Sequence, residues 1–188
     1  MARPKSENKR DAIMAAAIRV IATQGLSAPT ALIAREAGVA NGSLFNYFQT
    51  KADLLNELYL ELKAEMASVS LDGLPTDDDI QQQVFYMWSR WMEWATSHPD
   101  KRRTLTYLGV SDEITSNSHQ AASQAMSGIA RLLERSRENG PMRDAPLGFV
   151  VALMNALAEA TIDYMIQDPA NANKHCKAGF EAMWRIIA

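Results

Sequence analysis

Cysteine is nearly missing from this chain of 188 residues, in which Cys176 is the only one. A chain with one cysteine forms no internal disulfide, so its fold depends on an apolar core and suits a reducing compartment. The apolar share of the sequence, 47%, is large enough to fill such a core. We therefore expect a globular cytoplasmic protein.

A long hydrophobic run is missing as well. The most apolar stretch, residues 145–158, is interrupted by Asn155 and falls short of the ~20 residues that a membrane span requires. The charged N-terminal segment MARPKSENKR lacks the apolar core of a secretory signal. The sequence therefore predicts no export and no membrane partner, and residues 145–158 are expected to form a buried core helix.

An overall excess of basic charge is missing too, because the formal net charge is -3. The charges are unevenly distributed along the chain. Residues 1–51 carry seven basic and three acidic side chains, a net +4, whereas the remaining twelve basic and nineteen acidic side chains give -7. A basic N-terminal part on an acidic body is the distribution expected when only one end approaches nucleic-acid phosphates.

Neither sustained strand-like alternation nor an internal repeat is visible, and glycine is sparse, with nine residues. Apolar residues recur instead at the helical period, which predicts an all-α fold of about nine helices. The expected helices cover residues 7–24, 28–37, 41–48, 50–68, 76–97, 100–110, 116–139, 146–167 and 170–187.

Residues with special backbone or capping preferences mark the ends of the first helices. Gly25 and Gly38 stand where a left-handed residue ends a helix, and Gly38 begins the turn between the second and third helices. Thr50 followed by Asp53 is typical of a capping box at the start of the fourth helix. Further N-caps are expected at Asn41 and Thr76.

Residues 28–48 thus form a helix, a glycine turn and a second helix, the arrangement that places a recognition helix in the DNA major groove. The apolar side chains expected to point inward from the third helix are Leu44, Phe45 and Phe48. Those expected to point elsewhere are Ser43, Asn46 and Tyr47. A pair of helices used only for packing is the alternative interpretation of the same pattern.

The polar residues of this segment suit contacts with DNA. Asn46 can pair with adenine, Ser43 can bond to either partner of a base pair, and Gly42 permits a close approach. Tyr47 suits phosphate or sugar, and Lys51 adds charge to helix-start N–H groups that face a phosphate. The candidate DNA-binding residues are Thr30, Asn41, Gly42, Ser43, Asn46, Tyr47 and Lys51.

Residues 9–59, from KRDAIM to NELY, resemble the signature of the TetR family of bacterial transcription regulators. The resemblance rests on Ile33-Ala34, Ala37-Gly38-Val39, Gly42, Leu44, Phe45, Phe48, Lys51 and Leu54. It implies a helix-turn-helix DNA-binding domain at residues 1–51 and an effector-binding and dimerisation domain at residues 52–188. It also implies a ligand-responsive regulator of a palindromic double-stranded DNA operator, most simply a repressor, that acts as a homodimer through its last two helices.

Three further segments, MARPKSE, LFNYF and WxxWxxW, resemble a subgroup of TetR repressors that answer to drugs and bile-like compounds and control efflux. Two positions depart from the commoner family pattern. Phe45 stands where a tyrosine is frequent, and Ala31 stands where a longer polar side chain is common. Contacts from Thr30, or from a flexible basic arm at residues 3–10 that enters the minor groove, would compensate.

Large flat side chains with polar groups are concentrated in the central part of the chain and could line a pocket for a small hydrophobic or aromatic effector. The candidate ligand-binding residues are Tyr59, Met66, Phe85, Trp88, Trp91, Tyr107 and Met154. Methionines suit an adaptable multidrug pocket. The alternative is a stripe of core residues, because Trp88, Trp91 and Ala95 follow helical spacing.

The last two helices carry more apolar surface than one pair of helices needs, so two copies could bury it around a two-fold axis. The residues concerned are Phe149, Leu153, Leu157 and Thr161, followed by Phe180, Met183, Trp184 and Ile187. An intrachain core is the alternative interpretation.

No arrangement of serine, cysteine or paired acids indicates an enzyme, and no cofactor is expected. His175 and Cys176 are adjacent, so on a helix they point about 100 degrees apart and do not suit a shared metal ion. The acidic run Asp77–Asp79 is interpreted as helix capping and not as a metal site. A ligand-binding or protein-interaction module with a helix-turn-helix that no longer binds DNA is the alternative function.

Overall fold

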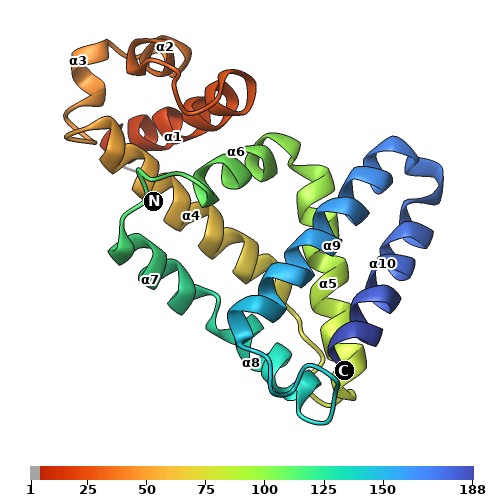
Figure 1. Cartoon of the computed structure of the whole chain (residues 1–188). Helices are drawn as coiled ribbons and strands as arrows, with labels where there is room; N and C mark the ends of the chain where they lie inside the picture. Colours follow the sequence, from red (N-terminus) through yellow and green to blue (C-terminus); the bar gives the residue numbers. More distant parts are fainter. Residues whose placement is uncertain (1–4) are drawn as a thin grey trace. The chain divides into compact units, whose positions relative to one another are not determined.

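A computed structural model describes the backbone of residues 5–188 and the side chains from residue 8 onward. Over these residues the protein contains ten α-helices, a single 3-10 turn and no strand, which confirms the all-α prediction (Figure 1). The elements are α1 (Lys5–Gln24), α2 (Thr30–Glu36), α3 (Asn41–Leu44), α4 (Lys51–Leu71), α5 (Ile80–Ser97), α6 (Pro99–Gly109), α7 (Ser116–Ala125), α8 (Ser127–Arg137), α9 (Leu147–Gln167), η1 (Pro169–Asn171) and α10 (Ala172–Ile187).

The count is ten instead of nine because the helix expected at residues 116–139 is interrupted. It divides into α7 and α8 at Met126, whose backbone angles of φ -84 and ψ 1 leave the helical range. No proline stands at the break, and the nearest glycine, Gly128, is the second residue of α8.

The helices gather into two compact units. The first contains the chain up to Lys63 together with His98–Gln124, and the second contains Ala64–Ser97 together with Ala125–Ala188. Helix α4 contributes residues to both units. The functional boundary expected after residue 51 is a different division and stays a prediction.

The core of the first unit joins α1 to the helices around it. Helix α1 packs on α2 and α6, and Ile13, Ile21 and Ile33 are completely buried. Each such side chain contributes about 1.5–3 kcal/mol by leaving water. The hydroxyl of Thr104 on α6 donates to the carbonyl oxygen of Ile18 on α1 at 3.1 Å, which fixes the contact between these helices.

The glycine and capping predictions are largely confirmed. Gly25 and Gly38 have φ values of 76 and 69 degrees, in the left-handed region that only glycine adopts at low cost. At the start of α4 the backbone N–H of Asp53 donates to Thr50 Oγ1 at 3.1 Å, and that of Thr50 donates to Asp53 Oδ2 at 2.9 Å. These two bonds form the expected capping box.

Two other N-cap predictions are wrong. The residue before α3 is Ala40, so Asn41 is its first helical residue and does not cap it. At α5 the carboxylate of Asp79, three residues after Thr76, accepts the backbone N–H of Gln82 at 2.9 Å. The acidic run therefore caps a helix, as interpreted from the sequence, but through its last member.

The core of the second unit is built around α5. Trp88 and Met87 are completely buried, and the indole N–H of Trp88 donates to the carbonyl oxygen of Cys176 on α10 at 3.1 Å. Helices α9 and α10 pack against each other and against α5 (Figure 1). A Cβ added at Gly179 would lie 2.1 Å from Thr161 Oγ1, so glycine is what allows α9 and α10 to approach at this point.

Helix α9 is only half buried, which corrects the expectation for residues 145–158. Val150, Met154 and Ala158 are buried, whereas Phe149 and Ala156 are exposed. Among the described residues α9 is the helix long and apolar enough to cross a membrane, and 33% of its most apolar window is buried. Length and composition alone are weak evidence for a span, because core helices of soluble proteins share them.

Candidate DNA interface and effector site

The turn between α2 and α3 is a closed hydrogen-bonded structure. The backbone N–H of Val39 donates to Ala34 at 3.0 Å and that of Gly38 to Arg35 at 3.1 Å. This pair of bonds, with a left-handed residue at Gly38, is the Schellman ending of a helix. The turn therefore fixes the direction in which α3 leaves α2.

The segment that follows the turn has a buried foundation. Leu44 and Phe48 are 0% and 1% exposed, and the backbone N–H of Phe48 bonds to the carbonyl oxygen of Leu44 at 3.1 Å. The helical path therefore continues in turns to Phe48, although α3 itself ends at Leu44. These two side chains hold residues 41–48 against the rest of the first unit.

The outer side of this segment is mostly polar. Asn41, Gly42 and Asn46 are exposed, and Ser43 and Tyr47 are half-buried. The inward orientation expected for Phe45 is wrong, because 41% of this residue is exposed. On a helix the positions i and i+4 share a face, whereas position i+1 is rotated by about 100 degrees. Leu44 and Phe48 thus fill the core without Phe45.

Five of the seven candidate DNA-binding residues lie in the first turns of three consecutive helices of the first unit, whereas Asn46 and Tyr47 lie in the turns after α3. Thr30 is the first residue of α2, Asn41 and Gly42 begin α3, and Lys51 is the first residue of α4. Lys51 is half-buried. Each helix beginning offers backbone N–H groups without helical partners, which suit phosphate oxygens.

The basic arm expected at residues 3–10 is only partly described. Residues 3 and 4 lie outside the described part of the chain, but Arg10 belongs to α1 and is not a flexible arm residue. Its Nη2 lies 2.5 Å from Glu57 Oε2 and 2.7 Å from Glu61 Oε1, both on α4. The hydrogen bond that Arg10 donates to the Glu57 carboxylate raises the pKa of Arg10.

The same guanidinium also covers an aromatic ring. Its central carbon lies 5.6 Å from the centroid of Phe48, within the range of a cation–π contact. Arg10 therefore joins α1, the end of the recognition segment and the first half of α4. This role was not predicted from the sequence, in which Arg10 was expected to belong to a DNA-binding arm.

Among the candidate effector residues, Tyr59 lies in the first unit within a polar group. Its hydroxyl is 3.3 Å from His119 Nδ1 on α7, and the two rings meet edge to face at 5.4 Å. The Nζ of Lys63 lies 5.9 Å from the centroid of the Tyr59 ring. Burial lowers the pKa of Lys63 and raises that of Tyr59. The spacing of Tyr59 and Lys63 by four residues was a signal for this contact in the sequence.

The other candidate effector residues are divided between the two units. Tyr107 is half-buried on α6 in the first unit. Met66, Trp88, Trp91 and Met154 are buried in the second unit, and the rings of Trp88 and Trp91 meet edge to face at 5.9 Å. These contacts are core packing, and the assignment of the residues to an effector pocket stays a prediction.

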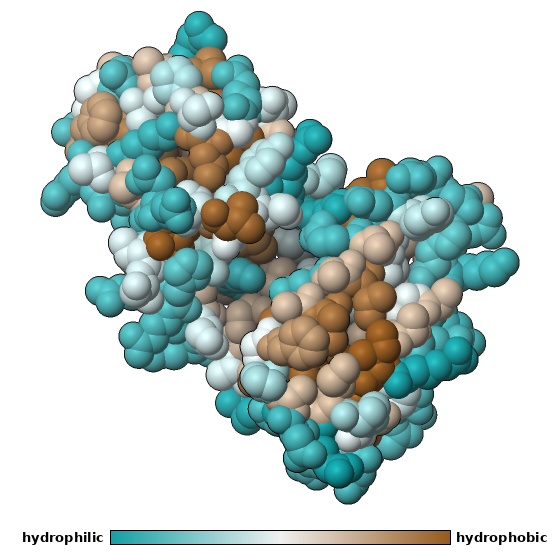
Figure 2. Space-filling view, in the orientation of Figure 1, coloured by the Kyte–Doolittle hydropathy of each residue, from teal (hydrophilic) through white to brown (hydrophobic). Residues whose placement is uncertain are grey.

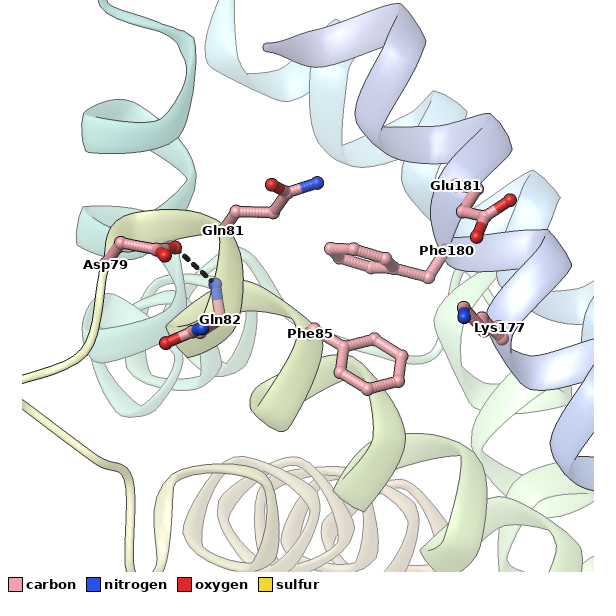
Figure 3. A pocket seen from close by; sticks show the side chains of 7 residues that line it. All are labelled: Asp79, Gln81, Gln82, Phe85, Lys177, Phe180 and Glu181. Atoms are coloured by element: carbon pink, nitrogen blue, oxygen red, sulfur yellow. Dashed lines mark hydrogen bonds between the residues drawn. The ribbon is translucent and has the colours of Figure 1, made fainter.

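Phe85, the remaining candidate, is 37% exposed and lines a pocket of about 240 Å³ in the second unit. The pocket lies between the start of α5 and α10, where the ring of Phe85 meets that of Phe180 edge to face at 4.9 Å (Figure 3). The polar residues around it are Asp79, Gln81, Gln82, Lys177 and Glu181. Of the seven candidates, Phe85 is the one that lines this pocket.

Helix α9 carries an apolar face that its own chain leaves uncovered. Phe149 is 53% and Tyr164 61% exposed, and the small residues between them on this side of the helix are Ala152, Ala156 and Ala160. Figure 2 shows apolar atoms gathered over this helix. Several residues expected in a dimer seam are instead buried within the chain: Thr161, Phe180, Met183 and Ile187. These four residues therefore belong to the intrachain core, which was the alternative interpretation.

The described residues contain no group of three side chains that could hold a metal ion. His175 Nε2 lies 3.0 Å from Asp168 Oδ2, and Cys176 Sγ lies 3.9 Å from Ser89 Oγ. The two neighbours thus contact different partners.

Residues 13–58 match the family model described as "Bacterial regulatory proteins, tetR family". A putative TetR family transcription regulator from Shewanella sp. PV-4 is 27% identical, with a TM-score of 0.84 over 94% of this chain and 96% of that chain.

Two structures with bound small molecules share the fold at lower identity. The TetR-like regulator LfrR from Mycobacterium smegmatis, in complex with proflavine, is 19% identical, with a TM-score of 0.69 over 96% of this chain and 98% of its own. The regulator FadR from Bacillus subtilis, in complex with stearoyl-CoA, is 15% identical, with a TM-score of 0.71 over 95% and 100%. The chain thus has a TetR-like fold with an N-terminal helix-turn-helix domain, and its residues 13–58 are similar to the TetR family of bacterial regulatory proteins.

Proposed function

We propose that this protein is a ligand-responsive repressor that binds a pseudo-palindromic operator as a homodimer and is released by a small hydrophobic or aromatic effector. The observation that carries the proposal is the segment from the Gly38 turn to Phe48. It presents exposed Asn41 and Asn46 above a buried foundation of Leu44 and Phe48. A rigid backbone with outward polar side chains is what a major-groove reader requires.

In this mechanism two copies place their recognition segments in successive major grooves, roughly 34–36 Å apart. Asn46 pairs with an adenine and Ser43 bonds to a neighbouring base edge. Thr30, Tyr47 and Lys51 bind phosphates and set the register, Gly42 allows close approach, and Asn41 contacts DNA beside it. Residues 1–51 act as the DNA-binding domain and residues 52–188 as the effector-binding and dimerisation domain.

The second copy of the chain covers the apolar face of α9 defined by Phe149, Tyr164 and the alanines between them. A two-fold axis brings the same face of both copies together. The alanines permit two helices to approach closely, and the aromatic side chains at either end supply most of the buried area. Dimerisation through α9 and α10 is what places two recognition segments on one operator.

The effector is a small apolar or aromatic molecule, as the resemblance to efflux repressors of drugs and bile-like compounds implies. Proflavine and stearoyl-CoA in the two solved relatives differ in chemistry, which supports variable effectors on this fold. Met66, Phe85, Trp88, Trp91, Tyr107 and Met154 are the proposed contacts, together with Tyr59. Tyr59 lies on α4 eight residues after Lys51, so one helix carries both an effector residue and a DNA residue.

Release requires that the effector prefer the conformation that does not fit the operator. A shift from mostly bound to mostly released needs a difference in affinity of several kcal/mol between the two states. Burial of one aromatic ring together with its stacking contacts supplies a few kcal/mol.

The proposal is tested by fluorescence anisotropy with labelled DNA from the region upstream of the chain's own gene, at two salt concentrations, with random DNA of equal length as the control. We expect tight binding to one upstream segment, weaker binding to random DNA, and release by proflavine or cholate. Equal salt-dependent binding to both DNAs would place the operator elsewhere.

One observation favours the alternative function, a ligand-binding or protein-interaction module with a helix-turn-helix scaffold. The exposed ring of Phe45 places an apolar surface on the recognition segment, where phosphate-binding groups are expected. Absence of binding to every DNA at low salt would favour this alternative.

A further inference from the structure

Phe45 leaves a large part of its ring exposed on the recognition segment. The core beneath it is already filled by Leu44 and Phe48, which are 0% and 1% exposed, whereas Phe45 is 41% exposed. Of the exposed large apolar side chains in the described part of the protein, Phe45 is the one that lies within residues 30–48. The exposed part of the Phe45 ring stays in water in the isolated chain and gains no stability from burial there.

The surface around this ring is open. A side chain on a helical segment covers the turn that precedes its own Cα, which here contains Asn41 and Gly42. No atom outside the immediate backbone lies within 4 Å of the position of a Cβ on Gly42. Asn41 and Asn46 on either side are exposed. The ring therefore borders an open strip on the side of the segment that carries the candidate base-reading side chains.

The chemistry of phenylalanine limits what it can read on DNA. The ring has no hydrogen-bond donor or acceptor group, so it cannot take over the phosphate bond of a tyrosine hydroxyl. In the major groove the bases present hydrogen-bonding groups and a single apolar one, the C5-methyl group of thymine. Contact with that methyl group removes apolar area of both partners from water.

We propose that Phe45 reads the C5-methyl group of one thymine in each half-site of the operator. This inference rests on the proposed function, since it assumes that residues 41–48 enter the major groove. Asn46 follows Phe45 directly, so we expect the thymine and the adenine read by Asn46 to be close neighbours in the half-site. The apolar surface that favoured a scaffold thus becomes a determinant of sequence specificity.

The test replaces thymine by deoxyuridine, which removes the methyl group and keeps every hydrogen bond of the base pair. The probe is the upstream duplex that the wild-type protein prefers over random DNA, with one symmetric pair of thymines replaced at a time. The proteins compared are the wild type, Phe45→Ala and the apolar control Phe45→Leu. The Kd is measured by fluorescence anisotropy for each combination.

For the wild type we expect one symmetric pair at which deoxyuridine raises the Kd about fourfold for one half-site and about fifteenfold for both. Phe45→Ala binds the thymine duplex more weakly and does not distinguish the two duplexes. Phe45→Leu keeps part of the distinction. Helix content of both variants should match the wild type and their melting temperatures should fall only slightly, because 41% of Phe45 is exposed and the core beneath it is filled by Leu44 and Phe48.

Two results would overturn the inference while leaving the proposed function intact. The first is specific wild-type binding that no deoxyuridine pair weakens. The second is a deoxyuridine penalty of the same size in Phe45→Ala, which would place the ring on the sugar or away from the DNA. If the wild type prefers no upstream duplex over random DNA, the proposed function fails and this inference fails with it.

Discussion

Residues 30–48 and helix α9 both leave surface uncovered in the single chain, but the surfaces have opposite chemistry. In residues 30–48 the exposed long side chains are polar, such as Arg35, Asn41 and Asn46, with Phe45 as the exception. On α9 the exposed face carries Phe149 and Tyr164 with alanines between them. A polar outer face suits the hydrated, charged grooves of DNA, and an apolar one suits another protein surface. The comparison therefore assigns different partners to the two surfaces.

The largest expected effect comes from a charge on the α9 face. Phe149→Asp places a carboxylate where the partner subunit is expected to bury it, and an unpaired buried charge costs about 3–5 kcal/mol. We expect a monomer at micromolar concentration, measured by light scattering, and operator affinity at least about a hundredfold weaker.

Phe85→Asp is the matched control, because Phe85 is also an exposed phenylalanine of the second unit but lies on α5. It should remain a dimer. A dimeric Phe149→Asp protein with wild-type operator affinity would show that the α9 face does not join the two copies.

A smaller effect is expected from the polar surface. Asn46→Ala removes a bidentate contact with adenine, worth about 1–3 kcal/mol in discrimination. We expect the ratio of operator to random-DNA affinity to fall about tenfold, with no change in dimerisation. Equal specificity of the two proteins in a competition assay would remove Asn46 from the base-reading set.

Lys51→Ala should act on all DNA sequences alike, because its partner is a phosphate. The expected change is a salt dependence, plotted as log K against log salt concentration, that is flatter by about one unit for each protomer. The operator preference should persist. An unchanged slope would mean that Lys51 contacts no phosphate.

The smallest effect concerns the connection between α9 and α10. Hydrogen bonds from His175, and next from Asn171, lower the pKa of Asp168. A lowered carboxyl pKa contributes stability above its ordinary value of 3.8 and loses it as the pH falls through the lowered value. Asp168→Asn should therefore reduce the Tm by about one degree at pH 7 and not at all near pH 2.

The exposed Asp144→Asn change provides the control for charge removal, since 88% of the Asp144 side chain is exposed. A loss that is equal at pH 7 and pH 2 would show that the Asp168 contacts are not electrostatic. DNA reading should be unaffected in both proteins.

Local signals explain which parts of the molecule could be predicted from the sequence. The turn at Gly38, the cap at Gly25 and the Thr50–Asp53 box each depend on a few neighbouring residues. Such local structures can therefore be predicted from the sequence. The inward orientation predicted for Phe45 was wrong because an apolar residue was assumed to be buried. Phe45 directly follows Leu44, so on a helix it cannot share the face of Leu44 and Phe48.

The remaining differences depend on contacts between distant segments. Whether Thr161 or Ala156 of α9 faces the chain's own core is decided by α10, which approaches through Gly179. The break at Met126 was not predicted, although Gly128 stands two residues after it at the start of α8. The effector pocket depends in the same way on side chains from several helices, which periodicity does not bring together.

The contacts of Arg10 have a mechanical consequence for the first unit. The guanidinium of Arg10 on α1 forms ion pairs with Glu57 and Glu61 on α4 and a cation–π contact with Phe48. These contacts connect α1, the end of the recognition segment and the first half of α4. To move the segment away from α4, the protein would have to break either the cation–π contact of Arg10 with Phe48 or both of its ion pairs with α4. A rotation of α4 is therefore expected to move the recognition segment with it.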